Sequence, residues 1–194
     1  ETFYLDKNSL IPRQDTELLI DLVLKRYNKE SKLNILDLGT GSGVIGITLS
    51  KLYPNSTITI SDISSKALNV ANKNIKNHNV TNIRSLESDW FDNFKEKELF
   101  DLILTNPPYI SKDDVHLNNL ELGYEPSNAL VAANDGFADI FKIIDTSPKF
   151  LNSGGLLIIE HGHSQGNRVK NYFQHRSFDN IKQHQDINQK IRVT

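Results

Sequence analysis

A turn with an amide, two prolines and an aromatic ring follows an apolar run in the middle of the chain. The turn is Asn106-Pro107-Pro108-Tyr109, and residues 99–105 before it predict a buried strand. The prolines end that strand, because proline lacks a ladder donor and restricts the residue before it. In an open α/β sheet, ligands bind just beyond the carboxyl ends of strands. The Asn106 side-chain oxygen and the bare carbonyls are acceptors, so we predict a site for a planar substrate with an amino group, whose flat face Tyr109 can cover.

A glycine-rich turn forms a second candidate site. It is Asp37-Leu38-Gly39-Thr40-Gly41-Ser42-Gly43, between a predicted strand at 33–38 and a predicted helix at 44–52. Glycines permit positive φ and let a ligand approach the main chain closely. By itself the turn also suits a plain strand-to-helix connection, and residues 41–46 fit the G-x-G-x-x-G pattern of dinucleotide sites.

Two side chains that follow predicted strands suit a nucleoside ligand. Asp62, after the strand at 57–61, is the acidic residue that would bind ribose hydroxyls, although it also suits the N-terminal charge of the next helix. Trp90, after the strand at 82–87, offers a purine stacking area and a polar edge, although a partly buried core aromatic would look the same. Asp62 would serve NAD and other nucleoside cofactors equally well.

A cluster of histidines raises the question of a metal. Glu160-His161-Gly162-His163 ends a predicted strand at 155–160, and two histidines two positions apart beside a carboxylate can bind zinc. The sequence offers no third clear ligand beside them. We therefore predict no metal site.

The elements that must position these residues alternate between strands and helices. Such alternation predicts a parallel sheet wrapped by helices. Further strands are expected near residues 178–183 and 190–193, and further helices near residues 16–27, 64–76, 137–148 and 165–174. Asp15 or Thr16 is expected to cap the first helix, Ser64 to cap the helix at 64–76, and Pro148 to end or kink the helix before it.

The composition narrows the class of protein. The 194 residues are 38% hydrophobic and 24% charged, which is typical of a globular domain. A net charge of −2 gives no general attraction to nucleic acid or anionic lipid, and no apolar stretch approaches membrane-spanning length. The absence of cysteine excludes disulfides and thiolate metal sites and fits a reducing compartment. A chain that begins with Glu1 and lacks methionine indicates a fragment.

Together these motifs resemble the HemK/PrmC-type N5-glutamine methyltransferases of peptide chain release factors. The Asp-x-Gly-x-Gly-x-Gly array is similar to the S-adenosylmethionine loop of class I methyltransferases. The chain departs from the family pattern at Gln14, where proline is usual, and in the stretch after Asp186, which lacks a glycine often found there. The matching stretches are residues 11–17, 37–43, 88–91, 106–109, 125–130, 134–136 and 160–162.

The resemblance implies an α/β fold with a doubly wound, mostly parallel, seven-stranded Rossmann-like sheet whose last strand is antiparallel. Residues 1–30 are then a lead-in segment and helix that join an N-terminal helical domain missing from this sequence, and residues 31–194 are the catalytic domain. The implied protein is cytoplasmic, acts on release factors, and binds neither nucleic acid nor membrane. Its cofactor is S-adenosylmethionine, with S-adenosylhomocysteine as product.

The resemblance also implies roles for particular residues. Asn106, Pro107 and Tyr109 are catalytic, and with Pro108 they bind substrate. The Asn106 oxygen and the Pro107 carbonyl accept both N–H bonds of the substrate amide, which aligns its nitrogen and favours developing positive charge. The cofactor-binding residues are Gly39, Thr40, Gly41, Ser42, Gly43, Asp62, Trp90 and Asn106.

Other functions remain as alternatives. An amino-methyltransferase acting on a nucleobase, either adenine N6 in DNA or a base in ribosomal RNA, would use the same asparagine turn, but it predicts a basic face. An NAD-dependent oxidoreductase leaves residues 106–109 unexplained. A domain that binds S-adenosylmethionine without turnover is a third alternative.

Overall fold

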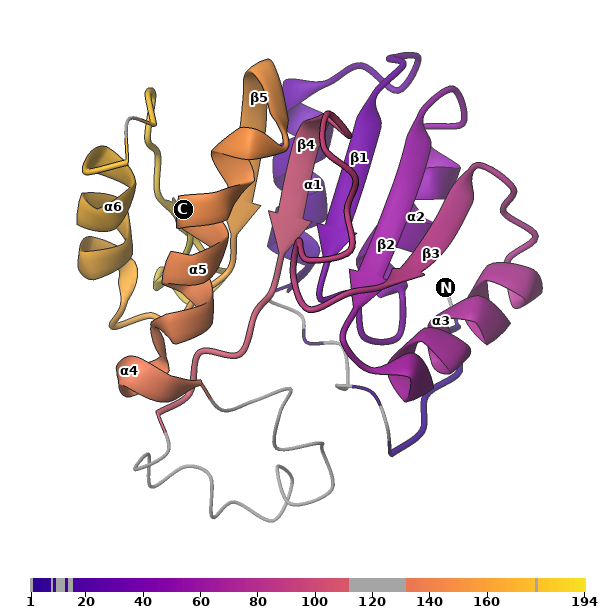
Figure 1. Ribbon diagram of the computed structural model, residues 1–194, viewed down its shortest axis with the longest axis horizontal. Helices are drawn as coiled ribbons and strands as arrows, with labels where there is room; N and C mark the ends of the chain where they lie inside the picture. Colours follow the sequence, from indigo (N-terminus) through magenta and orange to yellow (C-terminus); the bar gives the residue numbers. More distant parts are fainter. Residues whose placement is uncertain (1, 8, 10–12, 14–15, 112–131, 177) are drawn as a thin grey trace.

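A parallel sheet of five strands forms the centre of the computed structural model, which describes residues 2–7, 9, 13, 16–111, 132–176 and 178–194. Its strand order is β3-β2-β1-β4-β5, and every neighbouring pair is parallel (Figure 1). The chain builds β1, β2 and β3 toward one edge and then returns to place β4 on the other side of β1. The strands are β1 (Asn34–Leu38), β2 (Thr57–Asp62), β3 (Ile83–Glu87), β4 (Phe100–Thr105) and β5 (Leu151–Ile159).

Helices cover both faces of this sheet. Successive strand side chains point to opposite faces, so Ile35 joins one buried cluster while Leu36 joins the other. The cluster around Ile35 includes Leu19 of α1 and Leu49 of α2, and the cluster around Leu36 includes helices from the second half of the chain. The helices are α1 (Glu17–Arg26), α2 (Val44–Leu52), α3 (Ser65–Asn77), α4 (Ala133–Gly136), α5 (Ala138–Thr146) and α6 (Gly166–Gln174), with a 3₁₀ turn at Ser147–Lys149. The doubly wound α/β prediction is confirmed.

The predicted continuous seven-stranded sheet is wrong. The last two strands, β6 (His184–Gln185) and β7 (Ile191–Val193), form a separate antiparallel ribbon. This ribbon contacts the end of β5, where Ile159 and Thr194 exchange backbone hydrogen bonds of 2.9 and 3.0 Å and an isolated antiparallel bridge forms. The predicted antiparallel direction of the last strand is therefore confirmed.

The strand expected at residues 178–183 is also absent from the structure. Phe178 and Ile181 instead pack as single side chains against the core, and the Phe178 ring meets Phe173 edge-on at 5.0 Å. Their apolar pattern therefore reflects side-chain packing and not the hydrogen-bond ladder of a strand.

In the turn between β6 and β7, Gln189 has a φ of +59°, a conformation that favours glycine.

Several local predictions are confirmed. The helix at 44–52 has the expected bounds, and Ser64 Oγ accepts a hydrogen bond from the Ala67 N–H at 3.2 Å as the cap of α3. Pro148 follows α5 within the 3₁₀ turn. No helix in the described ranges is both long and apolar enough to span a membrane.

The lead-in segment lies along α3. Asn74, fully buried in that helix, accepts a hydrogen bond from the Tyr4 N–H at 2.8 Å and donates to the Tyr4 carbonyl at 3.0 Å. Its amide also donates to the Ser42 carbonyl of the glycine-rich turn at 2.9 Å. Tyr4 of the lead-in segment is thus bound to α3, and α1 packs in the core with residues of β1 and α2. The division into domains at residue 31 stays a prediction.

Gly46 provides a test of the packing that brings α2 onto the sheet. A Cβ atom at this position would lie 2.3 Å from Ile60 Cγ2 and 3.2 Å from Asp37 Oδ2. Overpacking costs about 1–3 kcal/mol, which exceeds the gain of up to about 1 kcal/mol from replacing a helical glycine with alanine. We expect Gly46→Ala to lower the free energy of unfolding in urea by roughly 1 kcal/mol or more. Thr48→Ala on the same helix serves as the control, and a Gly46→Ala protein as stable as the control would contradict this packing.

Candidate active site

The site lies where the strand order reverses, between β1 and β4. Leu38 at the end of β1 is in register with Thr105 at the end of β4, and Thr105 Oγ1 donates to the Leu38 carbonyl at 2.7 Å. The glycine-rich turn that follows β1 therefore lies beside the Asn106 turn that follows β4. Such a switch point is where open α/β sheets bind ligands.

A cavity of about 690 Å³ opens at this switch point. Residues of both turns line it, together with Asp62 after β2 and Trp90 after β3. Of the site residues expected from the sequence, Thr40, Ser42, Gly43, Pro107 and Tyr109 are not among the lining residues. The lining residues are Lys7, Ser9, Gly39, Gly41, Asp62, Ile63, Ser64, Ser65, Lys66, Ala67, Ser88, Asp89, Trp90, Asn106, Pro108 and Asp139.

Hydrogen bonds to the end of β2 hold the glycine-rich turn in place. The N–H groups of Gly39 and Thr40 both donate to the Ser61 carbonyl at 2.8 Å, and the Gly41 N–H donates to Asp62 Oδ2 at 2.9 Å. Gly41 has a φ of +57°, and a Cβ built there would meet nothing within 4 Å. This main chain is therefore open to the cavity, where a ligand can approach it closely.

Asp62 joins the turn to the cavity. Its second carboxylate oxygen accepts from the Ser64 N–H at 2.9 Å, so both oxygens already bond to backbone donors. Burial raises the pKa of Asp62, while the N–H groups of Ser64 and Gly41 oppose that shift. A carboxylate oxygen has more than one lone pair. Asp62 can therefore hold the turn and accept ligand hydroxyl groups at the same time.

Asp37 is a buried carboxylate whose role the sequence analysis did not assign. One of its oxygens, Oδ2, accepts from Thr40 Oγ1 at 2.5 Å and from the Gly46 N–H at 2.9 Å. The other, Oδ1, is buried without a hydrogen-bond partner in the part of the chain that the structure describes. Burial raises the pKa of Asp37 to about 6. Asp37 is fully buried and does not line the cavity, so it acts on the site by holding Thr40 and Gly46.

Trp90 lies at the cavity wall with its polar edge already engaged. Its indole Nε1 donates to Asp139 Oδ1 at 3.0 Å, and its ring packs against Gly39, where a Cβ would lie 3.2 Å from Trp90 Cζ3. The backbone of Trp90 has a φ of +48°, which is rare for a bulky residue. Only the face of the ring is therefore left for a purine.

The Asn106 turn divides its side chains between the cavity and the core. Asn106 and Pro108 line the cavity, whereas Pro107 is buried. The Asn106 Nδ2 group donates to Thr16 Oγ1 at 3.3 Å. The sequence predicts that the Asn106 oxygen accepts a hydrogen bond from the substrate. Because the Asn106 NH2 group is bound to Thr16, the oxygen is the end of the amide that is left for this role.

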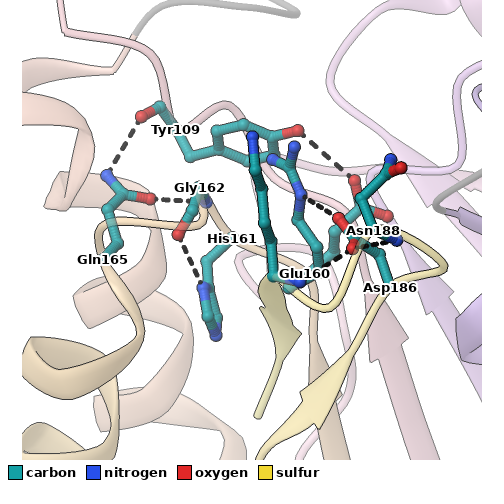
Figure 2. A network of polar contacts seen from close by, with 9 residues as sticks. Tyr109, Glu160, His161, Gly162, Gln165, Asp186 and Asn188 are labelled. Atoms are coloured by element: carbon teal, nitrogen blue, oxygen red, sulfur yellow. Dashed lines mark hydrogen bonds and ion pairs between the residues drawn. The ribbon is translucent and has the colours of Figure 1, made fainter.

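Tyr109 points toward the end of β5 (Figure 2). Its hydroxyl donates to Glu160 Oε1 at 3.4 Å, and its carbonyl accepts from Gln165 Nε2 at 3.0 Å. Gln165 Oε1 in turn accepts from the Gly162 N–H at 2.8 Å. Burial and the nearby Glu160 carboxylate raise the pKa of Tyr109, so its hydroxyl stays protonated at neutral pH.

His161 makes its contacts within the fold. His161 is fully buried, and its ring nitrogens contact Thr194 Oγ1 at 2.9 Å and the Gly162 carbonyl at 3.0 Å. Burial lowers the pKa of His161, which favours the neutral ring. Among the described residues, no group of three or more His, Asp or Glu side chains could hold a metal ion.

Some site residues escaped the sequence analysis. Asp37 carried a signal, as the first position of the glycine array. Thr16 before α1, Gln165 before α6 and Asp139 in α5 contact site residues that are far away in the chain. The matching stretch 125–130 and residues 11, 12, 14 and 15, including Gln14, lie outside the described residues.

Comparisons with known proteins identify the class and the family. The model of the methyltransferase small domain matches residues 14–122. The chain is 40% identical to the release factor glutamine methyltransferase of Francisella tularensis over all of this chain and 68% of that protein. It is 39% identical to the Escherichia coli enzyme of the same name, over 98% of this chain and 68% of that protein. A methyltransferase structure from Pyrococcus furiosus superimposes with a TM-score of 0.70 at 16% identity, covering 98% of this chain and 85% of that one.

The strand order and the cavity at the switch point are those of a Rossmann-like fold, and the matching family model makes the chain a class I methyltransferase. Within that class, the chain belongs to the release factor glutamine methyltransferase family. It spans about two thirds of the length of these relatives.

The buried Asp37 carboxylate makes stability depend on pH. Its folded-state pKa of about 6 exceeds the ordinary value of 3.8, so the unfolded state releases the proton first as pH rises. The stabilisation by the protonated group is complete below about pH 4 and is lost by about pH 6, a change of roughly 3 kcal/mol. Urea unfolding between pH 4 and 7 is expected to show this loss in the wild type and a smaller one in Asp37→Asn. The exposed Asp21→Asn control is expected to keep the wild-type slope, and equal slopes in all three proteins would contradict the shift.

Proposed function

We propose that this chain transfers a methyl group from S-adenosylmethionine to the side-chain amide nitrogen of the glutamine in the Gly-Gly-Gln motif of peptide chain release factors. The observation that carries the proposal is the position of Asn106 in the same cavity as Gly41 and Asp62. A cofactor held by the glycine-rich turn thereby lies beside an amide acceptor. The names of the relatives favour a protein glutamine over a nucleobase as the substrate.

The cavity residues fit S-adenosylmethionine. Gly41 offers open main chain, Asp62 offers carboxylate oxygens to ribose hydroxyls, and the Trp90 ring face offers an apolar surface to adenine. NAD would leave the Asn106 turn in the same cavity without a role, which favours S-adenosylmethionine over NAD. In one structure with the same fold, a 16S rRNA N2 methyltransferase from T. thermophilus, AdoMet and guanosine are bound.

In the proposed mechanism, the protein acts mainly by alignment. Bound S-adenosylmethionine supplies an electrophilic methyl group on its sulfonium. The Asn106 oxygen and the Pro107 carbonyl accept the two N–H bonds of the substrate amide, which orients the nitrogen and stabilises the positive charge that develops on it. Pro108 restricts the turn, and Tyr109 supports it through Glu160 and Gln165. The proton that the nitrogen loses passes to solvent.

Three further parts of the proposal concern the protein's setting. We propose that a helical domain precedes residues 1–30, that the protein works in the cytoplasm where release factors act, and that its substrate is bound as protein without nucleic acid. The net charge of −2 supports the last part, because a nucleic-acid site is expected to be basic.

Substitution of Asn106 tests the mechanism. Because a preorganised acceptor of this kind contributes on the order of 10²-fold or more to the rate, Asn106→Ala is expected to lose at least that much in kcat on a release factor. Mass spectrometry of the release factor after incubation with enzyme and S-adenosylmethionine measures the methylated glutamine. The exposed Asn77→Ala is the matched control and is expected to keep wild-type activity. Near-normal methylation by Asn106→Ala would falsify the role of Asn106, and methylation of DNA or RNA instead would favour the nucleobase alternative.

Cofactor identity has a separate test. Calorimetric titration with S-adenosylhomocysteine and with NAD is expected to show binding of the first and little of the second, because the proposed reaction uses S-adenosylmethionine and gives S-adenosylhomocysteine as product. Asp62→Ala is expected to weaken S-adenosylhomocysteine binding by roughly tenfold, the equivalent of about 1.4 kcal/mol, since it removes ribose acceptors and a bond to the turn. The exposed Asp21→Ala serves as control. A preference for NAD would rule out the methyltransferase proposal.

A further inference from the structure

The side chain of Asn106 is held at one end by a residue from the far side of the sequence. Its Nδ2 group donates a hydrogen bond to Thr16 Oγ1 at 3.3 Å, across 90 positions of the chain. Thr16 is 9% exposed, so little water competes for its hydroxyl. The contact joins the residue before α1 to the residue after β4.

Thr16 is free to make this contact because it does not cap its own helix. A threonine directly before a helix usually has an extended backbone and accepts a hydrogen bond from the first turn. Thr16 instead has helical dihedrals of φ −68° and ψ −23°, and its side chain makes no cap hydrogen bond. The expectation that Thr16 caps this helix is therefore wrong, while Asp15 lies outside the described residues. The hydroxyl is turned to Asn106.

The residues on both sides of Asn106 are held, so its freedom lies in the side-chain torsions. Thr105 is fixed in β4 by its hydrogen bond to the Leu38 carbonyl, and Pro107 is buried with its φ restricted by the ring. The terminal torsion of an asparagine side chain is broad and nearly two-fold. The Thr16 hydroxyl can accept from the NH2 end of the amide or donate to its oxygen, and in the structure it accepts from the NH2 end. With a substrate –NH2 group at the other end, this is the orientation in which every donor has an acceptor.

The choice matters because the two ends of the amide have opposite hydrogen-bonding character. The NH2 end donates and the oxygen accepts. With the NH2 end bound to Thr16, the oxygen is the end left for a substrate –NH2 group. In the opposite orientation, the NH2 group of Asn106 would face the –NH2 group of the substrate. Both groups are donors, so the substrate nitrogen would lose an acceptor.

We propose that Thr16 is a positioning residue that fixes the Asn106 amide with its oxygen toward the substrate amide nitrogen. The proposal rests on the proposed function, since it assigns an orientation to the acceptor used there. Thr16 does not touch the reacting atoms and acts only through Asn106.

Replacement of the hydroxyl by a methyl group tests the proposal. Thr16→Val keeps the shape of the side chain but has no acceptor, whereas Thr16→Ser keeps the hydroxyl. One hydrogen bond is worth about 1 kcal/mol, which corresponds to roughly a fivefold change in rate. We expect Thr16→Val to lower kcat on a release factor by roughly five- to tenfold and Thr16→Ser to restore most of it. The KM for the release factor and the Kd for S-adenosylhomocysteine are expected to stay within about twofold. The exposed Thr57→Val serves as the matched control, with wild-type kcat.

Two readouts separate positioning from a general structural role. The Asn106→Ala background should abolish the effect, so that adding Thr16→Val causes no further loss in single-turnover rate. NMR of the ¹⁵N-labelled protein, with the Asn106 side-chain signals assigned from the Asn106→Ala spectrum, should show faster solvent exchange of an Nδ2 proton in Thr16→Val than in wild type or Thr16→Ser. Thermal unfolding of the Thr16 variants should shift little, because no cap is lost.

The outcomes distinguish this inference from the proposed function. A wild-type protein that methylates no release factor contradicts the proposed function. A wild type that does so, with Thr16→Val equal to it in kcat, contradicts only the role of Thr16. A loss of kcat that follows the loss of folded protein, or that persists unchanged in the Asn106→Ala background, also overturns the positioning role.

Discussion

The pairing of β1 with β4 is the constraint on which the site depends. The chain reverses its direction of sheet growth between these strands, so their carboxyl ends have no crossover helix between them. The hydrogen bond from Thr105 to the Leu38 carbonyl fixes the register at the last residue of each strand. Directly after these residues, the segment that follows β1 enters the glycine-rich turn, and the segment that follows β4 enters the asparagine turn. The register of these two strands therefore places both turns at the same cavity.

Two buried carboxylates hold the glycine-rich turn in place through hydrogen bonds. Asp37 binds the turn and the first part of α2 from below, and Asp62 binds the turn from the neighbouring strand. Burial raises the pKa of both groups, which means that their hydrogen bonds offset only part of the desolvation of the charged form. The Asp62 carboxylate holds the glycine-rich turn and also lines the cavity. A substitution at either residue is thus a change to stability and to the site together.

A second network supports the asparagine turn from the other side of the sheet. Gln165 in the turn before α6 joins the Tyr109 carbonyl to the Gly162 N–H (Figure 2). Its amide also donates to the Gly136 carbonyl at 3.4 Å. Across from it, Asp186 accepts from backbone N–H groups of the last ribbon and from Arg192, and the Lys190 N–H is the main cause of its lowered pKa. Tyr109 lies between these two groups, which gives it a supporting position at the cavity and leaves Asn106 and Pro108 to line the cavity itself.

The sequence by itself determined the alternation of strands and helices and the bounds of α2. It also determined the glycine-rich turn and the asparagine turn, which both line the cavity. These features are local, because apolar periodicity, glycine with positive φ and proline without a donor act within a few residues. The tertiary structure alone decided that β6 and β7 form a separate ribbon, that residues 178–183 pack as single side chains, and that Thr16 holds Asn106 instead of capping α1. It also brought Gln165 to Tyr109 and Asp139 to Trp90. Each of these contacts joins residues far apart in the chain, and the order of strands and the packing of helices decide which distant groups meet.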